Sequence, residues 1–166
     1  MGKIGVVYYS RGGKTEKMAK LVYRGVEMEG LAAELKKVEE TSLEDLLLWD
    51  VIIVGSPTYY GLVVAPIKDF FDRSIKYHGK VGGAFSSAAN IGGGNETTIM
   101  SILQMMLIHG MVVQGSSKVD HYGPVSIHSP SERAIPQCEA LGRREARLVK
   151  KLGGKEREGS ANYSGD

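Results

Sequence analysis

The sequence predicts an α/β fold in which a doubly wound, five-stranded parallel sheet in the order 2-1-3-4-5 has helices on both faces. Short apolar runs alternate with segments of helical periodicity throughout the 166 residues, which indicates repeated βαβ units with right-handed crossovers. The run Val51–Gly55 is apolar at consecutive positions, as is typical of a strand covered on both faces. No repeat or internal linker divides the chain, so we expect one domain over residues 1–154.

The first half of the chain predicts three strands and two helices. Ile4–Tyr9 is an apolar strand, and the helix after it aligns four side chains on one face: Met18, Leu21, Val22 and Val26. Ala32–Val38 is a lysine-bearing strand suited to a sheet edge, and Val51–Gly55 is the third strand. Pro66 then opens a helix whose apolar residues also line up: Ile67, Phe70, Phe71 and Ile75.

The second half continues the alternation. Val81–Ser87 is the fourth strand, Glu96–Ile108 a helix and Met111–Gly115 the fifth strand. The last helix runs over Pro136–Leu152 and is expected to stop at the glycine pair 153–154. The polar tail 155–166 is expected to be mobile.

Composition limits the classes of function. The formal charge is only +2, from 21 basic and 19 acidic residues, so nucleic acid is an unlikely partner and the basic residues near the end most simply form a solvated helix face. The single cysteine, Cys138, has no internal disulfide partner, and no cysteine or histidine spacing predicts a metal site. No segment has the length of a membrane span. We therefore expect a cytoplasmic protein in a reducing compartment.

Three unusual segments follow strands one, three and four, so in a parallel sheet they emerge at the same edge. They are SRGGKT (10–15), SPTYYGLVVAP (56–66) and SAANIGGGNETT (87–98). The first is not an ATP-binding P-loop, because Tyr8 stands where that motif needs its leading glycine. A strand-to-helix turn still binds anions through free N–H groups. The second segment adds two adjacent tyrosines, and the third adds three consecutive glycines. Together the three segments predict a site for a planar heteroaromatic ligand with a phosphate, such as FMN.

The chain also resembles a known family, the flavodoxin-like WrbA family of type IV NAD(P)H:quinone oxidoreductases. The resemblance rests on YYSRGGKTEKMA, VIIVGSPTYYG, AFSSAANIGGGNETT, HGMVV and HYGPVSI, and extends over most of residues 1–150. It implies that the FMN phosphate is held by Ser10, Arg11, Gly12, Gly13, Lys14 and Thr15. It implies that one wall of the flavin site, along the isoalloxazine and ribityl chain, is formed by Pro57, Thr58, Tyr59, Tyr60 and Gly61. The other wall of this site would be formed by Ser87, Ala88, Ala89, Asn90, Gly92 and Gly93.

The resemblance implies an enzyme that takes two electrons from NAD(P)H and passes them to a quinone by a ping-pong scheme, with the flavin performing the redox chemistry. The substrate-side candidates are Tyr60, Tyr122 and His121. The last two lie in Ser116–Ile135, which is long enough to be a lid. His109 is a weaker candidate for a quinone oxygen and fits better as a helix-end residue. Ile108 stands where the family usually has a histidine.

The main alternative is a flavodoxin-type FMN electron carrier between protein partners. Such carriers tend to be strongly acidic, whereas this chain has a pI of about 8.6, so charge favours the two-electron reductase. A receiver domain and a low-molecular-weight phosphatase on the same fold are disfavoured: acidic residues are absent at Tyr9–Ser10 and Gly55–Ser56, and Cys138 is far from the first loop.

The apolar surface of the helix Glu96–Ile108 is wider than the single stripe that would face the sheet. Together with the resemblance, this predicts a homodimer or homotetramer.

Overall fold

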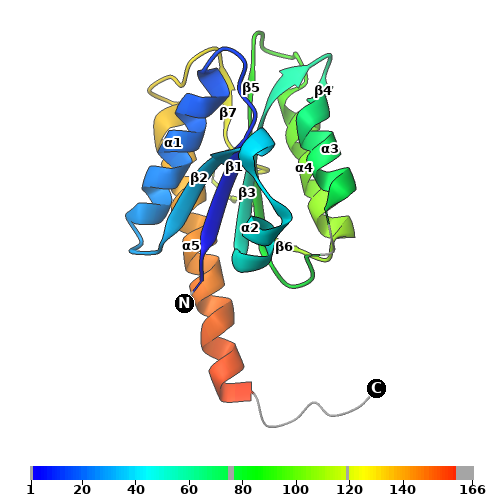
Figure 1. Ribbon diagram of the computed structural model, residues 1–166. Coiled ribbons are helices and arrows are strands. Elements are labelled where there is room, and N and C mark those ends of the chain that lie inside the picture. Colours follow the sequence, from blue (N-terminus) through cyan, green and yellow to red (C-terminus); the bar gives the residue numbers. More distant parts are fainter. Residues whose placement is uncertain (1, 75–76, 119, 160–166) are drawn as a thin grey trace.

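The computed structural model describes residues 2–74, 77–118 and 120–159. A parallel sheet forms its centre, with the strand order β2-β1-β3-β5-β6 (Figure 1). Its strands are β1 (Ile4–Tyr8), β2 (Ala33–Lys37), β3 (Val51–Tyr59), β5 (Val81–Ala88) and β6 (Val112–Val113). The predicted α/β class and the order 2-1-3-4-5 are thereby confirmed.

Helices cover both faces of the sheet (Figure 1). They are α1 (Lys14–Glu27) and α5 (Ala134–Gly159) on one face, and α3 (Ala65–Arg73) and α4 (Asn95–Ile108) on the other. Val6 and Ile53 pack into the core under α1 and α5, whereas Val7 and Ile52 pack into the core under α3 and α4. Successive side chains of a strand point to opposite faces, and here both faces are buried. The continuous apolar runs follow from this arrangement.

Two glycines allow α1 and α5 to pack backbone to backbone. A Cβ at Gly25 would lie 2.2 Å from the carbonyl oxygen of Glu139, and one at Gly142 would lie 2.1 Å from that of Val22. Any larger residue would force the helices apart, because packed interiors leave no room for an added methyl group. This contact fixes the carboxyl-terminal half of α1 against α5.

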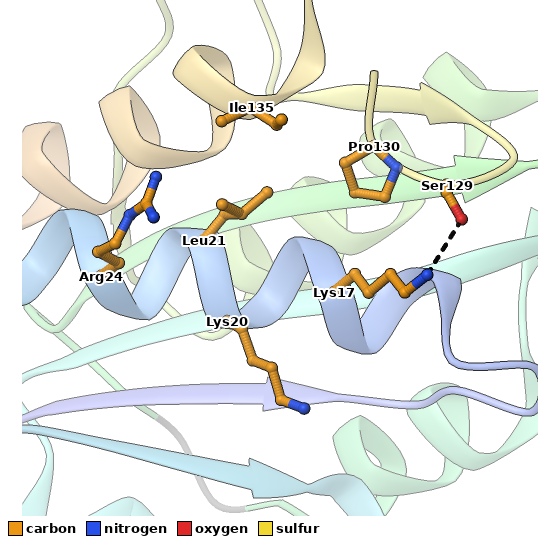
Figure 2. Close-up of a pocket in the computed structure, with 7 residues that line it drawn as sticks. All are labelled: Lys17, Lys20, Leu21, Arg24, Ser129, Pro130 and Ile135. Carbon is orange, nitrogen blue, oxygen red and sulfur yellow. Dashed lines mark hydrogen bonds between the residues drawn. The ribbon is translucent and has the colours of Figure 1, made fainter. Parts of the chain in front are cut away.

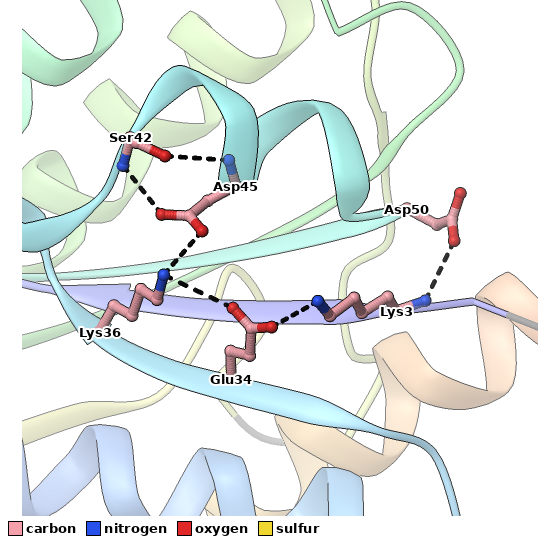
Figure 3. Close-up of polar contacts among 6 residues, drawn as sticks. All are labelled: Lys3, Glu34, Lys36, Ser42, Asp45 and Asp50. Atoms are coloured by element: carbon pink, nitrogen blue, oxygen red, sulfur yellow. Dashed lines mark hydrogen bonds and ion pairs between the residues drawn. The ribbon is translucent and has the colours of Figure 1, made fainter.

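A short helix that the periodicity did not predict, α2 (Leu43–Leu48), connects the 3₁₀ turn η1 (Val38–Glu40) to β3. The Ser42 side chain accepts from the Asp45 N–H, and the Asp45 carboxylate accepts from the Ser42 N–H, which makes a capping box. Figure 3 shows how Lys36 joins Asp45 to Glu34, with N–O distances of 2.6 and 3.7 Å. The network continues from Glu34 to Lys3, 2.5 Å away, and from the Lys3 N–H to Asp50. A helix of six residues is too short to show a period, so only its cap was a usable signal.

The fifth strand position is shared by two short strands, which corrects the prediction of one strand at Met111–Gly115. β6 pairs with Val81–Gly82, and β7 (Val125–Ile127) pairs with Ser86–Ala88 further along the same edge of β5. Part of the segment predicted to be a lid is therefore a strand of the sheet. The three-residue run VSI is too short to stand out from a loop by its pattern.

The hairpin strand β4 (Leu62–Val63) was also unpredicted and pairs antiparallel with the end of β3. The predicted end of the last helix was wrong, because α5 continues through Gly153 and the next glycine to Gly159. Glycine costs a helix only about 1 kcal/mol relative to alanine, and the residues KERE that follow are good helix formers. Residues 160–166 of the tail, and Ile75, lie outside the described residues. None of the described helices is long and apolar enough to cross a membrane.

Candidate functional site

The three loops predicted to form a site are joined by hydrogen bonds between hydroxyl groups. The Oγ1 of Thr15, at the start of α1, lies 2.8 Å from the Oγ of Ser87 at the end of β5. At the end of β3, Thr58 Oγ1 lies 2.9 Å from Ser86 Oγ and accepts from Thr98 Oγ1 at 3.1 Å. These contacts bring the segments after β1, β3 and β5 together at the carboxyl edge of the sheet.

The turn after β1 has the features of an anion cradle. Gly13 is the N-cap of α1 and has φ +81°, a left-handed conformation that glycine adopts without strain. No side chain caps this helix, so the N–H groups of its first turn face outward. The Oγ of Ser10 is buried and has no hydrogen-bond partner in the described part of the chain. Arg11, Gly12 and Lys14 are exposed around this turn.

The second loop is a tight hairpin that presents an aromatic ring to solvent. Pro57 and Thr58 are half-buried at the end of β3, and Tyr59 is 41% exposed. Tyr60 is fully exposed and has φ +53°, which is rare for a bulky residue. A tyrosine held in a strained conformation without packing contacts is available to stack on a ligand or partner.

The glycine loop after β5 lies against that hairpin. Gly94 has φ +103°, and a Cβ at this position would lie 2.4 Å from the Cα of Gly61. The Thr97 hydroxyl also donates to the Gly61 carbonyl at 2.6 Å. Of the other predicted residues, Ser87 and Ala88 are buried, whereas the remainder are exposed on the loop: Ala89, Asn90, Gly92 and Gly93. The second and third loops are therefore in direct contact at Gly61 and Gly94.

The structure does not bring Tyr122 and His121 together with these loops. They precede β7, and the next residue, Gly123, lies beside the middle of β5, where an added Cβ would be 2.0 Å from Ala84 O. His121 Nδ1 is hydrogen-bonded within its own loop to Ser116 O at 2.8 Å. The substrate-side roles of these two residues stay predictions.

His109 is placed away from the site. Its ring packs beside Phe71 and Tyr77, with ring centroids 5.8 and 5.0 Å away, and it caps the carboxyl end of α4. That end leads into β6 at the opposite end of the sheet from the three loops. His109 is thus the helix-end residue, and the alternative in which it bonds a quinone in its own chain is wrong. Ile108 lies at the same distant end and is 83% exposed.

The sequence and the fold are similar to those of known proteins. Residues 6–97 match the family model described as Flavodoxin, and the chain is 43% identical to a flavodoxin of Aquifex aeolicus (strain VF5), over 90% of this chain and 88% of that one. This chain belongs to the flavodoxin family. Among solved structures, an archaeal flavodoxin superposes with a TM-score of 0.76 at 29% identity, over 89% of this chain and 99% of that one.

Some relatives of this flavodoxin-family chain have enzyme names. An NAD(P)H dehydrogenase (quinone) of Caulobacter vibrioides (strain NA1000 / CB15N) is 32% identical over 93% of this chain and all of its own length. A WrbA-like flavodoxin of Agrobacterium tumefaciens has the same fold, with a TM-score of 0.76 at 24% identity over 91% of this chain and 99% of that one. The chain is therefore similar to both carriers and quinone dehydrogenases of the family.

The cofactor of this family is FMN, as the sequence predicted. The chain's own residues fit it. The buried, unpartnered Ser10 hydroxyl and the free N–H groups beside Gly13 suit a phosphate, and the exposed ring of Tyr60 suits a planar ring system. No group of three or more His, Cys, Asp or Glu that could hold a metal occurs among the described residues.

One histidine at the same edge was not predicted from the sequence. His128 follows β7, and its Nδ1 lies 3.4 Å from the Nζ of Lys14, while Lys17 Nζ lies 3.5 Å from Ser129 Oγ. Since β7 was not predicted, nothing in the sequence placed His128 beside the first loop. Next to this contact, a cavity of about 450 Å³ lies between α1 and the turn after β7, and Figure 2 shows the residues that line it. It is lined by Lys17, Lys20, Leu21, Arg24, Ser129, Pro130 and Ile135, so it lies beside the three loops and not between them.

Two buried titratable groups lie outside the site of this flavodoxin-family chain. Burial raises the pKa of Cys138 to about 12, with a further increase from Asp120, so its thiol is not reactive at neutral pH. Burial also raises the pKa of Glu145 to about 7, although the neighbouring Arg144 lowers it in part. One oxygen of Glu145 accepts from Arg144 Nε at 3.0 Å, and the other has no partner in the described residues.

Proposed function

We propose that this protein is a flavodoxin-type electron carrier that uses FMN to pass electrons between protein partners. Support comes from gaps within the alignments to the relatives. The alignment with the Aquifex flavodoxin runs over 162 positions, whereas that with the Caulobacter enzyme runs over 199 positions, although this chain has only 166 residues. At least 33 positions of the enzyme therefore have no counterpart here, so this chain lacks material that an enzyme could use to enclose its substrates.

In this proposal the turn after β1 holds the phosphate of FMN. The Ser10 hydroxyl and the N–H groups at the start of α1 donate to its oxygens, Thr15 is fixed by Ser87, and Arg11 and Lys14 supply positive charge. Gly12 and Gly13 let the backbone approach closely. Charge-assisted hydrogen bonds of this kind are about twice as strong as neutral ones.

The other two loops hold the ring system. One wall is formed by Pro57, Thr58, Tyr59, Tyr60 and Gly61, and the other by Ser87, Ala88, Ala89, Asn90, Gly92 and Gly93. When bound, FMN supplies a group that accepts and donates electrons singly or in pairs. The protein orients it, and the Gly61–Gly94 contact keeps the two walls at a fixed separation. The exposed Tyr60 ring lies where a partner would approach.

NAD(P)H:quinone oxidoreduction is the second candidate, and the charge of the chain favours it. With a formal charge of +2 and a pI of about 8.6, the protein lacks the net negative charge that helps carriers dock to basic partners. In this reaction Tyr60 would stack on nicotinamide or quinone. Tyr122 and His121 would contribute only after their loop moved from beside Ala84 toward the strand ends.

Rapid mixing separates the two candidates. The FMN-loaded protein is mixed without oxygen with NADH or NADPH, then with benzoquinone, while flavin absorbance is recorded. A carrier should not be bleached by either nicotinamide within seconds, but after reduction by a flavoprotein reductase it should reduce a one-electron acceptor such as cytochrome c. Rapid bleaching by a nicotinamide, followed by stoichiometric quinone reduction with ping-pong kinetics, would establish the enzyme and refute the carrier.

A further inference from the structure

The turn after β7 places a histidine at the carboxyl edge of the sheet. The His128 N–H donates to Ala88 O at 2.9 Å, and the Ser126 hydroxyl donates to His128 O at 3.4 Å. The backbone of His128 is therefore fixed beside the end of β5. Its imidazole reaches the first residue of α1, with Nδ1 3.4 Å from the Nζ of Lys14.

His128 occupies a backbone conformation that glycine would adopt more easily. Its φ is +59°, and the other non-glycine residues with positive φ in the described chain are Tyr60 and Asp120. Such strain is found preferentially at functional sites, where the side chain is used. The same strain at Tyr60, on the opposite wall of the site, agrees with this pattern.

The charges around His128 favour an anion at this point. Lys14 is the first residue of α1. Helix side chains lean toward the amino end of the helix, and the phosphate is expected at this end of α1. Lys17 contacts the next residue, Ser129, and the nearby Arg133 is already paired with Asp120. A protonated imidazole would be repelled by the ammonium group of Lys14. A phosphate between the two cations would attract both and so favour the protonated imidazole.

We propose that His128 is a further ligand of the FMN phosphate and binds it as imidazolium beside Lys14, so that FMN binding takes up a proton. The proposal rests on FMN as the cofactor and is independent of the choice between carrier and reductase. Free phosphate monoesters lose their second proton near pH 6, so above about pH 6.5 the phosphate is largely dianionic. Over this range the pH dependence of FMN affinity reports mainly on the histidine.

The test measures dissociation constants of the flavin-free protein for FMN and for riboflavin, which lacks the phosphate, at pH 6.5 and pH 8.5. Wild-type affinity for FMN should strengthen by roughly threefold to tenfold at the lower pH, since each unit of pKa shift is worth a factor of ten. His128→Gln should reduce FMN affinity at pH 6.5 by about tenfold and remove most of the pH dependence. Riboflavin affinity should not change. Ser129→Ala, in the same turn, is the matched control and should behave as wild type.

A second variant separates binding from a structural role. His128→Gly relieves the backbone strain, so the melting temperature of the flavin-free protein should rise while FMN affinity falls. A residue with a purely structural role would not show these opposite changes. The proposal is overturned if His128→Gln keeps wild-type FMN affinity and pH dependence, if riboflavin loses as much affinity as FMN, or if Ser129→Ala abolishes the pH dependence. None of these measurements involves turnover, so failure here would leave the proposed function standing.

Discussion

The hydroxyl oxygens of Thr15 and Ser87 lie 2.8 Å apart although the residues are 72 positions apart in sequence. Both side chains are buried, one at the start of α1 and the other at the end of β5. A hydroxyl can donate once and accept twice, so whichever of the two accepts keeps its own hydrogen for another acceptor. The pair therefore joins two loops of the site and still offers a donor to a phosphate.

Removing this pair should weaken both the fold and cofactor binding. Thr15→Val leaves the buried Ser87 hydroxyl without its partner, which should lower the free energy of unfolding by about 1–3 kcal/mol. Combined with Gly13→Glu, which forces a charged residue into φ +81°, it should weaken FMN much more than riboflavin. Denaturant unfolding and flavin titration measure the two effects, with Thr41→Val, on the exposed turn after η1, as the control. Equal losses for both flavins would show that the turn does not hold the phosphate.

Substitution of Gly94 should disrupt the contact between the hairpin and the glycine loop. A Cβ there would lie 2.4 Å from the Gly61 Cα and the backbone has φ +103°, whereas at Gly92, with φ +72°, nothing lies within 4 Å of an added Cβ. Gly94→Ala should therefore cost several kcal/mol of stability or flavin affinity, and Gly92→Ala only about 1–2 kcal/mol from backbone strain. Thermal melting and flavin titration of both variants provide the comparison. Similar behaviour of the two would mean that the contact is not a constraint.

Glu145 should make the protein less stable as pH rises. Its pKa is raised in the folded state, from 4.5 to about 7, so the folded state binds the proton more tightly than the unfolded state. Stability is lost between about pH 4.5 and 7, and the full cost, up to roughly 3 kcal/mol, is present above pH 7. Glu145→Gln, which resembles the protonated group, should be more stable than wild type at pH 8 and similar at pH 5.

Urea unfolding at both pH values measures this difference, with the exposed Glu132→Gln as a control that should change little. A stability difference of the same size at pH 5 and pH 8 would contradict a raised pKa for Glu145.

Self-association is predicted to use the carboxyl end of α4. Leu107 and Ile108 are 56% and 83% exposed there. Burial of these apolar side chains against a partner subunit would be favourable. Wild-type protein should sediment as a dimer or tetramer, and Leu107→Lys with Ile108→Lys should be monomeric. The same change at Leu47 and Leu48 of α2, which are 60% and 62% exposed, is the matched control and should leave the assembly intact. A wild-type monomer at all concentrations would rule out this interface.

The sequence alone determined the class of fold, the strand order and the three loops of the site. The long helices show a clear period, and the central strands are continuously apolar because both of their faces are buried, as with Val6 and Val7 of β1. Parallel alternation then places all three loops at one edge. FMN could be predicted for the same reason, since the loops contribute their backbone and small side chains locally.

Only the tertiary structure decided which further residues reach that edge. β4, β7 and α2 are too short to show a period, and they form because tertiary pairing or a cap stabilises them. The pairing of β7 with Ser86–Ala88 brings His128 to Lys14 and leaves Gly123, the residue after Tyr122, beside Ala84. In the same way, α5 continues past Gly153 because two glycines weaken a helix without ending it. Contacts between residues more than a hundred positions apart depend on this packing, which no local pattern records.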